Sequence, residues 1–459
     1  MMPHVSRGTN IAVGAAVLLS GCLSIKRPPE DLSKSQLDLP PAYAAAPHAS
    51  RTVVADNWTE EFRDQRILDL VDEALRRNPD LSVAAARREE AQARLQIAAS
   101  YLQPDLNAVI GASKTDPNDL QISNHFDLRL RVSWELDLWG RIRSEQEAAR
   151  ATAEASGWDL EFARQSLAAT VADSWFLAVA AQLQLAINRE LLQAEQFTAR
   201  VTRDRIEVGA ASRLDSEVAE ANLSLAEEAV HQSRGALLEV KKALEVLLGR
   251  YPVAELQVTG DLPSVPSPTP IGVPSELLER RPDIIAADRK VAAAFYNEQA
   301  AQAARLPRLE LSATLGTLLD PTQSIWSIGA NLLAPLFTGG RLKGDVLVAT
   351  AQQRQELGRY VSVALRAFRE VETALANEQV LVLRQAQLEQ ADARLRSASR
   401  IAQDRYNAGL LTILELTQVR RQDFAIRSQL LRVRTERLRQ RLNLLLALGG
   451  SFDTRETLR

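Results

Sequence analysis

Two long stretches of this sequence contain no proline, and this absence constrains the fold more than any other feature. All 19 prolines lie outside residues 118–251 and 336–459. Because proline in the interior of a helix costs about 3 kcal/mol, stretches of this length without proline permit very long helices. Aromatic residues make up only 5% of the chain, which also favours helices over a β-sandwich. We therefore predict that each stretch forms long helices.

Each of these stretches is expected to turn back on itself at a glycine. Glycine adopts positive φ values without strain, so a glycine between two helical runs favours a tight turn. Gly209 divides the first stretch, and Gly409 divides the second. We predict helical hairpins at 140–248 and 340–447, separated by an extended connector at 251–274 that contains six prolines.

An internal duplication relates the two hairpins. Residues 78–81 resemble residues 281–284, and Pro104 corresponds to Pro307, both at a spacing of 203 positions. Further along the chain the spacing is 200 positions, which predicts a loop of different length between the two sets of matches. The matches at the second spacing are Gly140-Arg141 with Gly340-Arg341, Gly209 with Gly409, and Leu248-Gly249 with Leu448-Gly449.

Each repeat is expected to contain a short helix, a pair of strands, a long helix and a shorter helix. The short helices are predicted at 81–103 and 284–306, and the strand pairs at 104–137 and 307–336. The predicted divisions of the chain are a signal peptide at 1–21, an acylated extended linker at 22–56, a first repeat at 57–250, the connector at 251–274, a second repeat at 275–450 and a tail at 451–459.

Residues 126–136 carry the signal of a membrane strand. Apolar and polar side chains alternate over this segment, which is the period of a β-strand. A half-buried strand of a soluble protein alternates in the same way, but eleven residues also match a tilted strand that crosses a bilayer. The side chains expected to face lipid are Phe126, Leu128, Leu130, Val132, Trp134 and Leu136.

Four membrane strands in one chain would require other copies of the chain. Unpaired backbone groups in hydrocarbon cost several kcal/mol each, so a sheet in a membrane must close on itself. Two copies would give about eight strands, whose interior side chains fill, whereas three copies would give about twelve strands with room for a lumen. We therefore expect an oligomer.

The amino terminus resembles a bacterial lipoprotein signal. A weakly basic start precedes an apolar stretch at 11–19, and Leu19-Ser20-Gly21-Cys22 resembles a lipobox. Cys22 is the one cysteine in the chain and is the expected acylation site. Leu23, rather than Asp, follows the cysteine, which favours the outer membrane. No later run of 18 apolar residues occurs, so no transmembrane helix is expected.

Together these features resemble the TolC-like outer-membrane efflux factors, in the OprM-like and NodT-like lipoprotein branch. The resemblance covers about 57–450 and includes Leu138-Trp139-Gly140-Arg141, Val208-Gly209 and Ala408-Gly409. It implies a mainly α homotrimer whose twelve-stranded outer-membrane barrel, four strands per protomer, continues as a periplasmic α-helical barrel of coiled hairpins. It also implies a passive exit duct for small molecules, driven by an inner-membrane transporter of the RND type through a periplasmic adaptor.

The resemblance also assigns roles near the hairpin turns. Tyr406, Gly409 and Glu415 match the region that constricts the periplasmic mouth, and Asp215 stands at the equivalent place in the first repeat. A threefold ring of carboxylates would attract cations, but a carboxylate in the first turn of a helix is also favoured by the helix dipole. The candidates for contact with the adaptor are Gly209, Arg213 and Leu410.

Other functions are less well supported by the sequence. We find no phosphate-binding glycine loop, no His-Glu-x-x-His and no nucleophile elbow, so an enzyme, a metal site or a cofactor is not expected. The formal net charge is −3, which does not favour nucleic acid as a partner. Two alternatives remain open: a duct for type I polypeptide secretion, and a helical envelope lipoprotein that forms no channel.

Overall fold

The computed structural model describes residues 25–29, 32–46, 58–115, 123–267, 271–319 and 322–450. The predicted signal peptide and Cys22 lie outside the described residues. The chain divides into two compact units, and each unit takes residues from both sequence repeats. The first unit comprises Met1–Asp38, Ala85–Asp159 and Asp283–Val363, and the second comprises Leu39–Ala84, Leu160–Pro282 and Ala364–Arg459.

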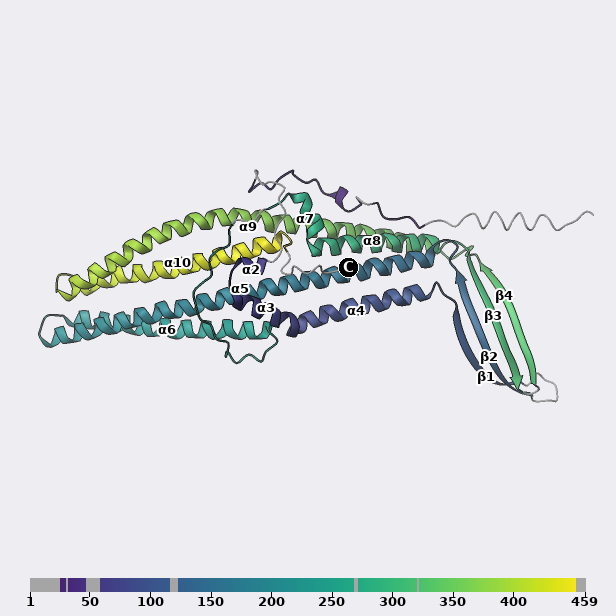
Figure 1. Ribbon diagram of the computed structural model, residues 1–459, viewed down its shortest axis with the longest axis horizontal. Helices are drawn as coiled ribbons and strands as arrows, with labels where there is room; N and C mark the ends of the chain where they lie inside the picture. The colour runs from purple at the N-terminus through teal and green to yellow at the C-terminus, as the bar shows by residue number, and fades with distance from the viewer. Residues whose placement is uncertain are drawn as a thin grey trace, which may run out of the picture. The chain divides into compact units, whose positions relative to one another are not determined.

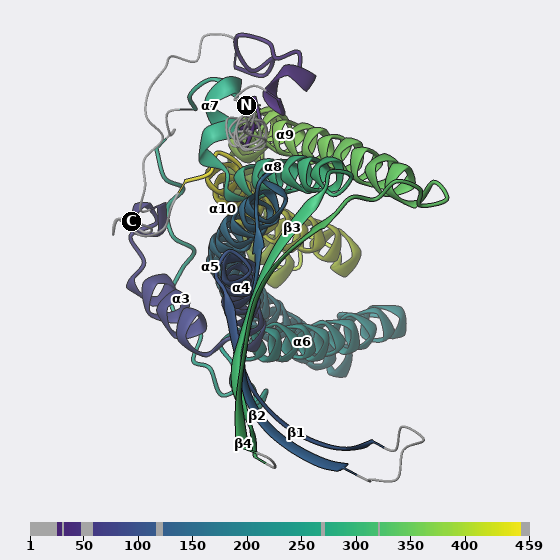
Figure 2. The same ribbon diagram turned by 90° about the vertical axis from the view of Figure 1, so that its right-hand side faces the viewer.

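The first unit contains a four-stranded antiparallel sheet (Figure 1). Its strands follow one another in the order of the chain, and Figure 2 shows that the sheet is curved. The strands are β1 (Asp105–Thr115), β2 (Ser123–Leu136), β3 (Arg308–Leu319) and β4 (Thr322–Leu333). Short connections join β1 to β2 and β3 to β4, whereas the helices of residues 141–303 lie in the chain between β2 and β3.

The strand register collects the apolar side chains on one face of the sheet. Leu130 lies opposite Ala108 of β1 and Leu315 of β3, so even positions of β2 share a face with apolar residues of both neighbours. Many of these side chains are exposed, including Ile110 at 82% and Ile328 at 81% of their surface. An exposed apolar surface of this kind indicates contact with lipid or with another chain.

The opposite face of the sheet is polar, and two glycines make room for an ion pair on it. Arg129 Nε lies 2.6 Å from Asp127 Oδ2. A Cβ atom at Gly111 would lie 2.5 Å from Asp127 Oδ1, and one at Gly316 would lie 2.4 Å from the carbonyl oxygen of Leu128. Charged side chains therefore lie close against this face, which suits contact with water.

Side-chain hydrogen bonds hold the ends of the strands to the helices that follow them. Trp139 Nε1 donates to the carbonyl oxygen of Pro307 at 2.7 Å, which ties the end of the first strand pair to the start of the second. Arg141 pairs with Glu135 at 2.9 Å. The helices of this unit are most of α4 (Pro79–Ser100), α8 (Pro282–Ala303), and the first parts of α5 (Arg141–Glu207) and α9 (Arg341–Asn407), together with the short η1 (Lys34–Gln36).

The described residues of the second unit form two helical hairpins and three short helices. Its hydrophobic core includes Trp58, Phe176 and Leu244, all of them fully buried. The hairpins combine the later part of α5 with α6 (Arg213–Leu247), and the later part of α9 with α10 (Ile413–Ala447) (Figure 1). The short helices are α2 (Trp58–Glu61), α3 (Gln65–Arg77) and α7 (Pro274–Arg280).

Helix α5 is long and apolar enough to cross a membrane by length and composition alone. Its residues 168–179 include Trp175 and Phe176, which are buried in the core of the second unit. Packing in this core accounts for the buried part of the apolar stretch of α5, which is 44% of it.

The matching Pro-Asp motifs mark places where one helix end meets another in the second unit. Asn78 Nδ2 donates to the carbonyl oxygen of Leu247 at the end of α6, and Asn78 Oδ1 accepts from the backbone of Leu81 in α4. In the second repeat, Arg281 Nη1 donates to the carbonyl oxygen of Ala447 at the end of α10. These side chains satisfy backbone groups that a helix end leaves without partners.

Candidate functional site

Both hairpins of the second unit end in turns with the same backbone geometry. The first turn comprises residues 208–212 and the second comprises 408–412. Gly209 has φ +70° and Gly409 has φ +77°. The nitrogen of the following residue donates to the carbonyl oxygen five residues earlier, at 2.7 Å from Ala210 and 2.9 Å from Leu410. Both turns are thus Schellman motifs, which explains why glycine occupies these positions.

Capping boxes start the helices that follow the turns. In the first turn, Ser212 Oγ accepts from the backbone of Asp215, and Asp215 Oδ2 accepts from the backbone of Ser212 at 2.8 Å. Thr412 and Glu415 make the same exchange, at 3.3 and 2.9 Å. The two carboxylates predicted to line a mouth are therefore first of all helix caps, a pattern visible in the sequence as Ser/Thr-x-x-Asp/Glu.

The environment of Glu415 favours its charged form. The hydroxyl and the backbone nitrogen of Thr412 both donate to the Glu415 carboxylate and lower its pKa from the ordinary value. The Glu415 side chain is exposed, so its charge remains available to ions or to another chain. The capping role and a charged mouth are thus compatible for this residue.

Exposed side chains cluster beside both turns. Arg213 is 94% exposed, and its Nε atom lies 3.8 Å from Glu217 Oε1, a long and solvated contact. Leu410 is 76% exposed, although a leucine normally loses this surface to a core or a partner. The other large apolar side chains exposed around the turns are Val208, Leu214 and Leu414.

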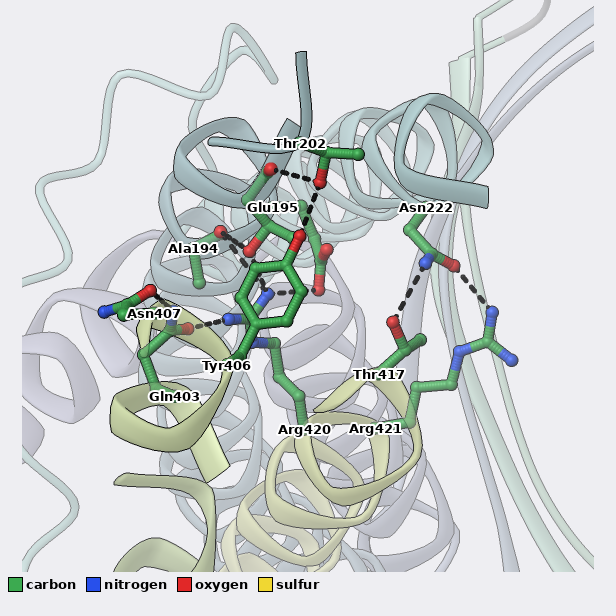
Figure 3. A network of polar contacts seen from close by, with 11 residues as sticks. Ala194, Glu195, Thr202, Asn222, Gln403, Tyr406, Asn407, Thr417, Arg420 and Arg421 are labelled. Carbon is green, nitrogen blue, oxygen red and sulfur yellow. Dashed lines mark hydrogen bonds and ion pairs between the residues drawn. The ribbon is translucent and has the colours of Figure 1, made fainter. Parts of the chain in front are cut away.

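Tyr406 lies inside the second unit, between the two hairpins (Figure 3). It is only 3% exposed, and its hydroxyl lies 2.7 Å from Thr202 Oγ1 on α5. The guanidinium of Arg205 lies 4.4 Å from the centre of the Tyr406 ring. The role of Tyr406 at the mouth, which the resemblance implies, stays a prediction. Within one chain its side chain joins the hairpin α5–α6 to the hairpin α9–α10.

Arg420 makes a second connection between the hairpins, which sequence reasoning missed. Its Nη1 atom donates to Glu195 Oε1 at 3.1 Å and to Thr198 Oγ1 at 2.9 Å (Figure 3). The Arg420 and Glu195 side chains are 4% and 5% exposed. A second nitrogen of Arg420 donates to Gln403 on α9. A buried ion pair of this kind holds α5, α9 and α10 together.

Local periodicity explains how Arg420 reaches this position. Ile413 and Leu416 are buried in a small hydrophobic cluster with Tyr406. Arg420 follows at the spacing of the same helix face, so an arginine takes a place where the pattern calls for an apolar residue. That interruption of the apolar face was the available signal in the sequence.

A further polar contact lies beside this cluster. Asn222 Nδ2 donates to Thr417 Oγ1 at 3.3 Å, and Arg421 Nη2 donates to Asn222 Oδ1 at 2.7 Å (Figure 3).

In the part of the chain that the structure describes, no group of three or more His, Cys, Asp or Glu residues is arranged to hold a metal ion. The arrangement near the turns is thus one of caps and connections between helices.

Known proteins share both the sequence pattern and this fold. The profile of the outer membrane efflux protein family matches residues 70–250 and 273–450. The pyoverdine export outer membrane protein OpmQ of Pseudomonas aeruginosa is 32% identical, with 96% of each chain covered. The cation efflux system protein CusC of Escherichia coli is 29% identical over 86% of this chain and 88% of its own length.

A comparison with solved structures gives the same type of protein. The outer-membrane channel OprN superposes with a TM-score of 0.86 at 28% identity, covering 94% of this chain and 99% of OprN. The predicted fold class is confirmed, since the long helical hairpins and the four-stranded sheet of this chain superpose on a solved outer-membrane channel. Because the family match spans both repeats and the likeness extends over nearly the whole fold, the chain belongs to the outer membrane efflux protein family.

Proposed function

We propose that three copies of this chain form an outer-membrane channel that serves as the passive exit duct of a tripartite efflux system. The observation that carries this proposal is the amphipathic sheet with one apolar face, one polar face and two edge strands that each pair on one side only. In hydrocarbon such edges require further strands. Three copies supply about twelve strands, enough to enclose water.

The proposed cargo is small molecules. The relatives carry printed names that refer to pyoverdine, to toluene and to cations. These names describe those proteins, and what they have in common is the small size of the exported compound. We therefore favour small-molecule efflux over polypeptide secretion for this chain. A periplasmic adaptor and an inner-membrane transporter of the RND type would supply recognition and energy.

The hairpin turns are the proposed periplasmic mouth and the contact surface for the adaptor. Exposed Leu410 and Arg213, next to Gly409 and Gly209, offer an apolar and a charged contact at the ends of the hairpins. Asp215 and Glu415 would place carboxylates at the mouth while they cap their helices. Tyr406 and Arg420 would control the width of the mouth by holding the hairpins together.

A lipid anchor at Cys22 is a separate part of the proposal. Acyl chains on this residue would hold the amino terminus at the membrane, because each buried methylene contributes about 0.8 kcal/mol. Metabolic labelling with a fatty acid should mark the wild-type chain and leave Cys22→Ala unlabelled. Equal labelling of both chains would remove the anchor from the proposal without affecting the channel.

Purified protein in planar bilayers tests the channel. We expect trimeric particles that conduct ions, with larger conductance in Arg420→Met, where the connection between the hairpins is broken. Trimers that never conduct would favour a helical envelope lipoprotein without a channel. Monomers that remain embedded in lipid with their sheet intact would contradict the proposed closure of the barrel.

A further inference from the structure

The junction between the sheet and the helices of the first unit carries a group of aromatic side chains. Trp134 lies near the end of β2, Trp139 follows this strand by three residues, and Tyr101 lies between α4 and β1. Tyr101 remains 58% exposed. Tryptophan and tyrosine are typical of the depth at which lipid headgroups meet hydrocarbon. Because the proposed function places the apolar face of the sheet in lipid, this junction lies at the depth of the headgroups.

A hollow of about 630 Å³ lies at this junction. Its walls include Trp139, residues Gln299 and Arg305 at the end of α8, and Lys26 of the amino-terminal segment. Figure 1 shows that α8 and α5 meet the sheet at this end of its strands. Binding sites for small molecules commonly have volumes of about 300–1,000 Å³. The hollow is therefore large enough for a lipid headgroup.

The amino-terminal segment forms one wall of the hollow and is held there by its backbone. The backbone nitrogen of Lys26 donates to Gln299 Oε1 at 3.0 Å, and Gln299 Nε2 donates to the carbonyl oxygen of Lys26 at 2.7 Å. Both ends of the Gln299 amide are thus used to hold a single residue of this segment. As a result, the backbone of Lys26 is fixed on α8 while the residue stays exposed.

The hollow carries positive charge without a counter-charge. Lys26 and Arg305 are both exposed, and neither has an ion-pair partner among the described residues. None of the described residues that line the hollow is an aspartate or a glutamate. Lysine and arginine bind phosphate through charge-assisted hydrogen bonds. These two side chains therefore suit an anion that carries a phosphate group.

Apolar side chains line the rest of the hollow. They include Leu306, which is 37% exposed, together with Ile25 and Val346. A free phosphate ion would gain nothing from these side chains, whereas the first methylenes of a phospholipid would be removed from water against them. Basic pockets in membrane proteins bind anionic lipid headgroups in this way. The combination of cations, an aromatic ring and apolar side chains thus favours a lipid over an inorganic anion.

We infer that this hollow binds an anionic phospholipid, whose phosphate contacts Lys26 and Arg305 and whose glycerol region packs against Trp139. The inference rests on the proposed function, because it requires the sheet to lie in a membrane. The lipid comes from the leaflet on the side of the helices. One bound phosphate then connects the amino-terminal segment to the end of α8, and it ties the junction to the headgroup layer.

Native mass spectrometry of the intact trimer measures this binding. The purified protein is titrated with phosphatidylglycerol as the anionic lipid and with phosphatidylcholine as the zwitterionic one. Lys26→Gln with Arg305→Gln removes both charges of the hollow. Arg66→Gln with Lys242→Gln removes two exposed charges of the second unit and is the matched control. Lys26→Arg with Arg305→Lys keeps the charges, and the helical circular dichroism of every variant should match that of the wild type.

The loss of both charges should weaken the binding of phosphatidylglycerol about thirtyfold, because each basic residue beside an anionic lipid contributes about fivefold in affinity. Binding of phosphatidylcholine should not change. The control variant and the variant that keeps the charges should bind phosphatidylglycerol as the wild type does. Unchanged affinity after loss of both charges would overturn the site, and so would an equal loss of affinity in the control variant.

Two further measurements separate the remaining explanations. Inorganic phosphate at the same concentration should not displace phosphatidylglycerol, and displacement would overturn the lipid in favour of a free anion. A role of Arg305 only in neutralising the end of α8 predicts that Arg305→Gln lowers stability with unchanged lipid affinity, which would also overturn the site. Conductance in planar bilayers tests the channel separately. Conducting trimers that do not prefer phosphatidylglycerol overturn the lipid site alone, whereas trimers that never conduct overturn the proposed function.

Discussion

The two hairpin turns have the same local geometry but very different surroundings. Arg203 and Glu220 in the first hairpin correspond to Gln403 and Arg420 in the second, 200 positions further on. The first pair is a salt bridge of 2.9 Å whose side chains are 64% and 46% exposed. Arg420 is only 4% exposed and reaches across to Glu195. Equivalent positions in the repeat thus carry one surface pair and one buried connection.

The residues that begin the second helices differ in the same way. Arg213 is 94% exposed, whereas its counterpart Ile413 is 2% exposed and packs beside Tyr406. Both positions directly follow the N-cap residue of a capping box of the same kind. Turn geometry therefore depends on the local sequence, and burial depends on which helix lies alongside. We therefore expect the same substitution at the two turn glycines to lower stability by the same amount. Matched substitutions in the contacts between the hairpins should lower stability by different amounts.

The largest expected effect comes from breaking the buried ion pair. Arg420→Ala would leave the Glu195 carboxylate buried without its partner, which should lower the free energy of unfolding by about 3 kcal/mol. The matched change in the first hairpin, Glu220→Ala, should cost about 0.5 kcal/mol because its partner Arg203 is solvated. Denaturant unfolding followed by helical circular dichroism measures both.

The double variant Arg420→Met with Glu195→Leu serves as the control for this prediction. Removal of both charges leaves no buried charge without a partner, so most of the lost stability should return. If Arg420→Ala and Glu220→Ala lowered the free energy of unfolding equally, the buried pair would contribute no more stability than a surface pair.

Removal of the Tyr406 hydroxyl should have the next largest effect. Tyr406→Phe loses the contact of 2.7 Å with Thr202 and should cost about 1 kcal/mol. Thr202 Oγ1 also donates to the carbonyl oxygen of Thr198, so this hydroxyl keeps one partner. A double-mutant cycle with Thr202→Val isolates the shared contact. Strictly additive costs in that cycle would show that the hydroxyls do not interact.

Alanine at the two turn glycines should cost the same in both hairpins. No atom lies within 4 Å of a Cβ built at Gly209 or Gly409, so backbone strain at positive φ is the only penalty. Each change should lower stability by roughly 1 kcal/mol. Unfolding midpoints of the two variants, measured at the same protein concentration, provide the check. A clear difference between them would refute the view that turn geometry is purely local.

The smallest expected effect concerns pH at the second turn. The pKa of Glu415 is lowered because Thr412 donates two hydrogen bonds to its carboxylate. Its contribution is therefore present above the ordinary value of 4.5 and is lost as the pH falls through the lowered folded pKa. Thermal unfolding of Glu415→Gln should depend less on acid than that of the wild type, and an unchanged acid dependence would argue against this role.

The sequence predicted the elements well where the pattern was local. Prolines and glycines placed the hairpins, so that α5 begins just after Gly140 and α9 just after Gly340. Strict alternation predicted β2, which starts at Ser123, three residues before the predicted start at Phe126. The roles at the turns stay predictions, because both carboxylates cap their own helices within one chain, whereas a mouth requires further copies.

The sequence by itself determined the duplication, the long helices, the glycine turns and the amphipathic strands of this protein. Each of these follows from backbone preference or from periodicity over neighbouring residues. Only the tertiary structure decided that Tyr406 and Arg420 are buried contacts between hairpins, whereas Glu220, the counterpart of Arg420, forms a solvated pair with Arg203 in the first hairpin. Those contacts join residues more than 200 positions apart, and no local pattern specifies which distant helix will lie alongside.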